Sequence, residues 1–361
     1  MEGMVSTSRV SWQGRRVLVT GHTGFKGAWL SIWLDALGAK VVGLSLPPSE
    51  PSLYEQCGLD RVIESQFGDI GDNELFRQFV AAAEPELVFH LAAQPLVGLS
   101  YEDPVGTYRT NVMGTVHLLE ACRAVRSVRA VIVITSDKCY ENREWAWPYR
   151  EIDPVGGHDP YSSSKGCAEL VVASWRRSFF AREKRLLLAS ARAGNVIGGG
   201  DWARERLIPD CVRAMEAGSA VRLRNPSAVR PWQHVLDALA GYRLLCERLL
   251  TGDVSVCGAW NFGPSADDMR SVSEVVSAFS KVSDGRLEWL FVPGSHPHEA
   301  GLLTLDSSKA RQYLGWRPRL EFDQAIDWTA GWYRRQRAGE SALSLCREQI
   351  ALYESRIEAL V

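Results

Sequence analysis

The sequence has no large excess of charge of either sign and no hydrophobic run long enough to cross a lipid bilayer. Its 41 basic and 43 acidic side chains give a formal net charge of -2, which provides no strong field to attract nucleic acid or an anionic membrane surface. The longest apolar stretch, residues 28–46, is interrupted by Asp35 and Lys40, whereas a membrane-spanning helix needs about 20 apolar residues. We therefore expect neither nucleic acid nor a membrane among its partners.

The chain also lacks the cysteine patterns of metal sites and the leader of an exported protein. None of its eight cysteines forms a Cys-x-x-Cys pair, and the cysteines and histidines do not show zinc-site spacing. The first eleven residues contain no apolar core typical of a signal peptide. These absences predict reduced cysteines, no bound metal and a cytoplasmic location.

A glycine-rich turn near the N-terminus is the first positive signal. The apolar run 17–20 is followed by Gly21-x-x-Gly24-x-x-Gly27, which indicates a strand, a tight turn and the start of a helix. Unpaired amides at a helix N-terminus, together with the helix dipole, hold a phosphate, and glycines allow it to approach closely. Three glycines at this spacing also occur in ordinary turns, so this signal alone is weak.

The second signal is the pair Tyr161 and Lys165. Residues four apart on a helix share one face, so the lysine ammonium can favour the phenolate and move a pKa of about 10 closer to neutrality. Alone, such a pair is usually a solvated helix face. Combined with the glycine turn in one chain, it predicts dinucleotide-dependent redox chemistry on a hydroxyl group.

Strand-like and helical patterns alternate through the first half of the chain, which predicts an α/β fold with a doubly wound parallel sheet of the Rossmann type. Ligands bind at the carboxyl ends of strands in such sheets, which is where the glycine turn and the other polar motifs lie. The expected strands are 17–20, 40–44, 87–91, 130–135 and 186–191.

The pattern loosens after residue 194, which predicts a smaller C-terminal α/β substrate lobe. Helices are expected at 206–217 and 235–250, short strands near 220–223 and 259–262, and final helices at 323–337 and 341–360. We divide the chain into a dinucleotide-binding domain that carries the catalytic residues (12–193), a nucleotide-sugar lobe interleaved with it (194–340), and a C-terminal helix (341–361).

Several motifs together resemble those of the extended short-chain dehydrogenases that act on nucleotide sugars. The resemblance covers nearly the whole chain, and segments 135–140 and 191–202 are most similar to the dehydratases that act on CDP-linked glucose. It is carried by Gly21-x-x-Gly24-x-x-Gly27, Asp69-Ile70, His90-Leu91-Ala92-Ala93-Gln94, Asn111, Thr135-Ser136-Asp137-Lys138, Tyr161-x-x-x-Lys165, Asn195 and Arg230-Pro231-Trp232-Gln233-His234-Val235.

The resemblance implies NAD as the cofactor. Asp69 would hydrogen-bond the adenine amino group, although the same residue fits a strand-end cap before Gly71. Residues 43–46 contain no carboxylate for the adenosine ribose and no arginine for a 2′-phosphate, which favours NAD over NADP. The implied NAD-binding residues are Gly21, Thr23, Gly24, Phe25, Lys26, Gly27, Asp69, Ile70, Leu91, Ala92, Ala93, Gln94, Asn111, Tyr161 and Lys165.

The resemblance also implies five catalytic residues. Tyr161 would take the proton from the sugar 4-hydroxyl, Lys165 would keep the phenol acidic and hold the nicotinamide ribose, and Ser136 would hydrogen-bond the 4-oxygen. Asp137 would protonate the departing 6-hydroxyl. Lys138 stands where dTDP-glucose relatives carry the glutamate that removes the carbon-5 proton, and a lysine can do this only if its pKa is strongly lowered.

The expected reaction converts CDP-D-glucose to CDP-4-keto-6-deoxy-D-glucose, as in deoxysugar and lipopolysaccharide O-antigen synthesis. Asn195, Arg230, His298 and Glu299 are the candidate substrate-binding residues, with Arg230 suited to a diphosphate. The alternatives are a nucleotide-sugar 4-epimerase, which needs no acid and base for elimination, and a non-catalytic dinucleotide-binding regulator. A homodimer that pairs through the helices expected at 103–124 and 162–182 completes the prediction.

Overall fold

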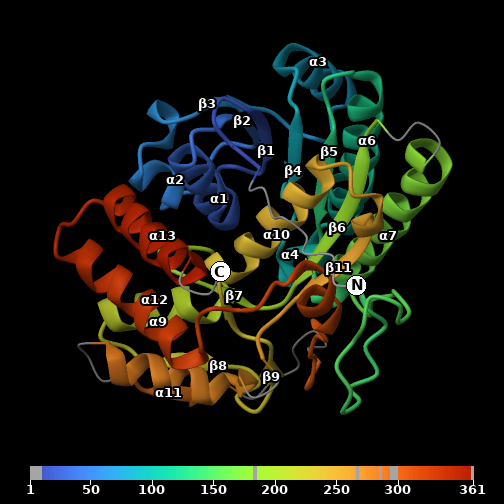
Figure 1. Ribbon diagram of the computed structural model, residues 1–361. Helices are drawn as coiled ribbons and strands as arrows, with labels where there is room; N and C mark the ends of the chain where they lie inside the picture. The colour runs from blue at the N-terminus through green and yellow to red at the C-terminus, as the bar shows by residue number, and fades with distance from the viewer. Residues whose placement is uncertain (1–9, 182–184, 266–267, 284–286, 293–299, 359–361) are drawn as a thin grey trace, which may run out of the picture.

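The computed structural model describes residues 10–181, 185–265, 268–283, 287–292 and 300–358. At its centre lies a seven-stranded sheet in the order β11-β6-β5-β4-β1-β2-β3, with every neighbouring pair parallel (Figure 1). The doubly wound α/β fold is therefore confirmed. Its strands are β1 (Arg16–Thr20), β2 (Lys40–Ser45), β3 (Glu64–Phe67), β4 (Leu87–His90), β5 (Ala130–Ile134), β6 (Leu187–Ala193) and β11 (Gly258–Phe262).

Helices cover both faces of this sheet and build the C-terminal part of the molecule. Three further pairs of short strands lie outside the central sheet: β7 (Val196–Ile197) with β10 (Gln233–His234), β8 (Val221–Leu223) with β13 (Trp289–Phe291), and β9 (Val229–Arg230) with β12 (Arg270–Ser271). The helices are α1 (Phe25–Ala36), α2 (Leu53–Gln56), α3 (Asn73–Ala83), α4 (Val97–Glu102), α5 (Pro104–Tyr108), α6 (Gly114–Ala124), α7 (Pro160–Trp175), α9 (Leu207–Glu216), α10 (Val235–Leu250), α11 (Val272–Val282), α12 (Phe322–Arg337) and α13 (Ala342–Glu358).

Two hydrophobic cores form on the two faces of the sheet. Val17 and Val19 of β1 pack into the core that contains α1, α10, α12 and α13, whereas Leu18 packs into the core with α3, α6 and α7. Successive strand residues point to opposite faces, and both faces are covered, so a central strand is apolar at every position. All five residues of β5 are accordingly buried.

Two strands of the sheet differ from the sequence-based expectation. β3 was not expected, because its sequence Glu-Ser-Gln-Phe is mostly polar and no residue of it is fully buried at the sheet edge. The strand near 259–262 was expected in the smaller lobe, but β11 pairs with β6 at the opposite edge of the central sheet. Its short sequence shows an extended segment without showing which sheet it joins.

The C-terminal helices close the face of the sheet that carries α1. α13 packs against both α1 and α12, and Figure 1 shows α13 beside α1, with α12 on its other side. No helix in the described part of the chain is long and apolar enough to span a membrane. All eight cysteines are described and none forms a disulfide, in agreement with the expectation of reduced thiols.

Candidate active site

A cavity of about 880 Å³ opens at the carboxyl ends of the central strands. Segments that follow β1, β4, β5 and β6 meet there, as the position of ligands in parallel α/β sheets predicts. Most of the predicted site residues line this cavity. They are Gly21, Thr23, Gly24, Phe25, Lys26, Gly27, Asp69, Ile70, Leu91, Ala92, Ala93, Ser136, Asp137, Lys138, Tyr161, Lys165, Asn195 and Arg230.

The glycine-rich turn between β1 and α1 forms one end of the cavity. Gly21 has a φ of 75°, a conformation that residues with a side chain rarely adopt, and a Cβ atom there would lie 2.7 Å from the Ala92 nitrogen. A Cβ atom on Gly27 would lie 2.0 Å from the Gly21 oxygen. Gly24, the residue before α1, provides no side-chain cap for the first amides of the helix, and residues 24–27 line the cavity. This cradle fits a pyrophosphate.

The end of β2 presents Ser45 and Leu46 to the cavity. The Thr23 and Ser45 hydroxyls lie 2.7 Å apart, so the strand end where dinucleotide folds usually carry an acidic residue is polar but uncharged. Asp69 accepts a hydrogen bond from the Gly71 amide at 2.8 Å and one from Arg109 at 2.9 Å. The strand-end cap is therefore real, and Asp69 also borders the cavity.

Asn111 and Gln94 lie behind the cavity wall rather than in it. The Asn111 side chain accepts from the Gln94 amide at 2.8 Å and donates to the Gln94 carbonyl and to Ser164 of α7. The Gln94 side chain donates to Thr107 and to the Leu96 carbonyl. Both residues thus hold the segment after β4 against α7, so any effect they have on a bound cofactor passes through Ala92 and Ala93.

Tyr161 and Lys165 are both buried in the first turns of α7. The helix begins with Asp159, whose carboxylate accepts from the Ser162 amide, and with Pro160 at its first position, which are two favourable helix-start signals. Burial raises the pKa of Tyr161 to about 12, and a hydrogen bond with Ser136 opposes the rise. Burial lowers the pKa of Lys165 to about 8, with Glu169 acting against the decrease.

The prediction that Lys165 lowers the Tyr161 pKa is wrong for the protein chain alone. Burial outweighs the neighbouring charges and raises that pKa instead of lowering it. The Lys165 ammonium donates a 3.4 Å hydrogen bond to the Ile134 carbonyl at the end of β5.

Asp137 is buried in a single 3-10 turn directly after β5. The Ser136 hydroxyl donates to one Asp137 carboxylate oxygen at 2.9 Å, and the other oxygen is buried without a partner among the described residues. Burial raises the pKa of Asp137, although the positive charges of Lys138 and Arg230 partly offset the rise. These surroundings favour the protonated carboxyl, which is the form a general acid needs.

Lys138 and Arg230 supply positive charge on the same side of the cavity. Lys138 is half-buried, and no ion pair joins it to Asp137, although both residues are described. The Arg230 guanidinium is buried and donates to the carbonyls of Val229, Ala300 and Gly301. Arg230 therefore both borders the cavity and anchors the 300–301 segment.

The other predicted residues divide into two groups. Asn195 borders the cavity and its carbonyl accepts from the Gln233 amide at 3.0 Å, whereas His298 and Glu299 lie outside the described residues. Two histidines near the site are buried. Burial lowers the pKa of His90 and of His234 to about 3, so the neutral form of each is favoured.

Sequence reasoning missed several charged residues of this region, among them Arg206, Arg222, Glu169 and Arg192. Arg206 and Arg222 line the cavity, and Arg206 forms a 3.0 Å ion pair with Asp201. Glu169 and Arg192 form a buried 2.8 Å ion pair behind it. Glu169 continues the four-residue spacing of Tyr161 and Lys165, which was a usable signal, but the contacts of the three arginines depend on the fold. The described residues contain no cluster of metal-ligating side chains.

Comparison with known proteins agrees with this geometry. The family model described as GDP-mannose 4,6 dehydratase matches residues 18–329, so the chain belongs to this family of nucleotide-sugar dehydratases. A curated relative, CDP-glucose 4,6-dehydratase of Salmonella typhimurium, is 51% identical and the match covers 95% of this chain and 97% of the relative.

Solved structures of related proteins share the fold. The dTDP-glucose 4,6-dehydratase of Bacillus anthracis in complex with NAD superimposes with a TM-score of 0.74 at 21% identity, covering 91% of this chain and 100% of that one. The UDP-glucose 4-epimerase of Thermus thermophilus in complex with NAD has a TM-score of 0.74 at 26% identity, covering 88% and 99%. Dehydratases and epimerases therefore use the same fold, and the site must distinguish between them.

Proposed function

We propose that this protein is an NAD-dependent hydro-lyase that converts CDP-D-glucose to CDP-4-keto-6-deoxy-D-glucose. The observation that carries the proposal is the convergence of Ser136, Asp137, Lys138, Tyr161 and Lys165 on one cavity. The CDP-glucose 4,6-dehydratase of Salmonella typhimurium matches nearly the full length of both chains. A 4-epimerase has no need of a buried acid beside the tyrosine, so Asp137 favours the dehydratase.

NAD bound in the cavity supplies the hydride acceptor for carbon 4 and the hydride donor for carbon 6. The first amides of α1 would hold its pyrophosphate, Asp69 and Ile70 would border its adenine end, and Lys165 would hold its nicotinamide ribose. Tyr161 accepts the proton of the 4-hydroxyl, and Ser136, hydrogen-bonded to Tyr161, positions the 4-oxygen. Each of these residues lines the cavity.

Oxidation at carbon 4 makes the carbon-5 proton acidic, and elimination then requires a base and an acid. Asp137 is the acid: its buried carboxyl, with a raised pKa, protonates the 6-hydroxyl as it leaves as water. Lys138 lines the same cavity and removes the carbon-5 proton. Lys138 would then return the proton to carbon 5 as carbon 6 receives the hydride. With both returned, the net change to the sugar is the loss of one water.

The diphosphate and the cytidine occupy the part of the cavity farthest from the glycine turn. Arg230, suited to the diphosphate, and Asn195 border the cavity, and Arg222 on β8 adds a further cation at the cavity wall. Guanidinium groups bind phosphate oxygens in a bidentate manner. The division into a dinucleotide domain (12–193) and a nucleotide-sugar lobe (194–340) follows from this arrangement, with β11 belonging to the central sheet.

The working unit is a cytoplasmic homodimer. Val105 and Met113, on the continuous helical segment from α5 to α6, are 77% and 45% exposed, and Leu170 on α7 is 58% exposed. Apolar side chains on two helices that pack together are suited to a symmetric contact with a second copy.

Mass spectrometry of the product tests the proposal. The purified protein is incubated with NAD and, in parallel, with CDP-, dTDP-, UDP- and GDP-glucose. We expect loss of one water from CDP-glucose only. An unchanged mass with an inverted 4-hydroxyl would make the protein an epimerase, loss of water from another nucleotide would correct the base preference, and no turnover of any of the four would contradict the proposal.

A further inference from the structure

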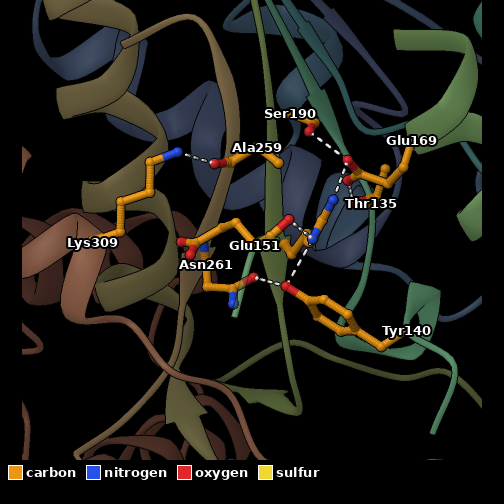
Figure 2. Close-up of polar contacts among 9 residues, drawn as sticks. Thr135, Tyr140, Glu151, Glu169, Ser190, Ala259, Asn261 and Lys309 are labelled. Atoms are coloured by element: carbon orange, nitrogen blue, oxygen red, sulfur yellow. Dashed lines mark hydrogen bonds and ion pairs between the residues drawn. The ribbon is translucent and has the colours of Figure 1, made fainter. Parts of the chain in front are cut away.

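Behind the cavity lies a buried polar network centred on Glu169 of α7 (Figure 2). One carboxylate oxygen of Glu169 accepts from the Thr135 hydroxyl at 2.5 Å. The other accepts from the Ser190 hydroxyl at 2.8 Å and from the Arg192 guanidinium at 2.8 Å. Glu169 and Arg192 are 5% and 3% exposed, so the pair is shielded from solvent and its charges are weakly screened.

Arg192 extends the network to the other end of the catalytic segment. Its guanidinium donates to the Tyr140 hydroxyl at 2.7 Å and lies 4.8 Å from the centre of the Tyr140 ring. The Tyr140 hydroxyl donates in turn to the Asn261 side chain of β11 at 2.7 Å. Figure 2 shows Tyr140 and Asn261 on one side of the network and Thr135, Ser190 and Glu169 on the other.

The network therefore holds the residues on both sides of the acid-base segment. Thr135 directly precedes the segment 136–139, and Tyr140 directly follows it. The Thr135 side chain hydrogen-bonds Glu169, and the Tyr140 side chain hydrogen-bonds Arg192, so both ends of the segment are attached to the same ion pair. The segment is a short turn whose position relative to α7 determines the distance from Asp137 to Tyr161. Small displacements of such groups reduce catalysis strongly.

The ion pair also faces Lys165 from one helical turn away. Glu169 on the same helix and Cys139 in the segment 136–139 raise the pKa of Lys165. Lys165 in turn lowers the pKa of His90 at the end of β4 and of Lys26 on α1. The Glu169 carboxylate is the main group that opposes the effect of burial on Lys165. Lys26, in the same cavity, responds to Arg206, Lys165, Asp137 and Asp201, and Glu169 is not among the groups that act on it.

We propose that the Glu169–Arg192 pair is a positioning unit of the active site, which keeps segment 136–139 in register with α7 and keeps Lys165 charged. The proposal rests on the proposed function only for the role of that segment, because the charge of Lys165 can be measured without turnover. Folds often tolerate the replacement of a buried ion pair by apolar side chains. The effects of the pair on the position of segment 136–139 and on the charge of Lys165 can therefore be measured in variants that still fold.

The charge of Lys165 is tested by labelling with acetic anhydride over a pH series, with peptide mass spectrometry as the readout. The variants are Glu169→Gln, which leaves Arg192 unpaired, and Glu169→Gln with Arg192→Met, which removes both charges. We expect the pH of half-maximal labelling of Lys165 to fall by about one unit or more in both variants, as loss of a nearby carboxylate predicts. Lys26 is the internal control and should stay in place or shift upward.

The register is tested with the charges left intact. Thr135→Val removes the hydrogen bond to Glu169, and we expect kcat for CDP-glucose to fall about tenfold or more, with KM and the labelling pH of Lys165 unchanged. Thr135→Ser keeps the hydroxyl and should restore kcat.

Two results would overturn the proposal. One is an unchanged labelling pH of Lys165 in the double variant, which removes both buried charges. The other is a Thr135→Ser variant as slow as Thr135→Val, which would mean that the hydroxyl has no positioning role. If the wild-type protein turns over none of the nucleotide sugars, the proposed function fails, while the labelling experiment still decides the role of the ion pair.

Discussion

At the scale of single residues, burial rather than residue type has the largest effect on the pKa of Asp137 in the site. Asp137 is almost fully buried and its pKa is raised, with Lys138 and Arg230 limiting the rise. An isolated buried carboxylate is costly, so the protonated form is stabilised relative to that of an exposed aspartate.

The first prediction separates the two steps of the elimination. Asp137→Asn removes the acid but leaves the residue nearly the same size, so we expect water loss to slow about 100-fold or more. Exchange of the carbon-5 hydrogen with solvent deuterium should continue, because Lys138 is intact. Lys138→Met should abolish both. Deuterium incorporation and product mass are followed by mass spectrometry.

Tyr161→Phe is the control for this experiment, because without oxidation at carbon 4 neither exchange nor water loss should occur. If Lys138→Met still exchanges the carbon-5 hydrogen, another group is the base. If Asp137→Asn loses water at the wild-type rate, the assignment of the acid is wrong.

At the scale of elements, the turn into α1 owes its shape to two close backbone approaches. The second prediction compares Gly27→Ala with Gly24→Ala. A methyl group at Gly27 would lie 2.0 Å from the Gly21 oxygen, whereas the nearest atom to one at Gly24 is 3.4 Å away. We expect Gly27→Ala to lower the free energy of unfolding by about 1–3 kcal/mol and Gly24→Ala to leave it nearly unchanged, as measured by urea unfolding without cofactor. Equal effects of the two substitutions would contradict the geometry.

The third prediction concerns Asp237 of α10, which joins α10 to α13. One carboxylate oxygen accepts from the Tyr353 hydroxyl of α13 at 2.7 Å and from the Arg319 amide at 2.6 Å, while the other is buried without a partner in the described structure. Burial raises the pKa of Asp237 to about 7, compared with about 3.9 for an exposed aspartate. The folded state therefore binds the proton more tightly than the unfolded state.

It follows that the free energy of unfolding should decrease as pH rises from about 4 to about 7. Asp237→Asn keeps an acceptor for Tyr353 but carries no charge, so the contribution of this site to the pH dependence should disappear. Melting temperatures measured from pH 5 to pH 8 test this, with Asp327→Asn, at an exposed position of α12, as the matched control. The prediction fails if both variants keep the wild-type slope.

At the scale of the whole molecule, the exposed apolar side chains of α5 to α7 set the expected assembly. The fourth prediction is that light scattering gives twice the 40.1 kDa mass of one chain, and that Leu170→Lys or Val105→Lys gives the monomer mass. A charge in an apolar contact is strongly unfavourable. Ile152→Lys, at a position 81% exposed outside these helices, is the control and should remain a dimer; a monomeric wild-type protein would contradict the prediction.

Much of the fold could be read from local patterns. The strands at 17–20, 40–44, 87–91, 130–135 and 186–191 and the helix at 235–250 agree with the structure to within about two residues, because buried parallel strands are apolar at nearly every position. β3 was not predicted as a strand, because a strand at the edge of a sheet can be polar and then lacks the apolar pattern of a buried strand. β11 was recognised as a strand but placed in the wrong sheet, since strand pairing is a long-range property.

Many residues that line the cavity could be predicted from the sequence, because ligands in parallel α/β sheets bind at the carboxyl ends of the strands. Tyr161, Lys165 and Asp137 were named from motif and resemblance, and all three line the cavity. The direction of the Tyr161 pKa shift was wrong, since it depends on burial, which no local spacing reveals. Arg206 and Arg222 were not predicted as cavity residues, because the local sequence around them has no pattern that shows whether their side chains face the cavity.

The sequence by itself determined the parallel α/β sheet, the glycine turn and the spacing of the tyrosine and lysine, because each depends on residues that are neighbours in the chain. Only the tertiary structure decided which polar and charged side chains contact one another. Glu169, Arg192 and Asn261 come from three separate elements and Thr135 from the loop after β5. Asp137 owes its raised pKa to the chain packed around it. Burial and long-range pairing are properties of the folded chain as a whole, so no short segment encodes them.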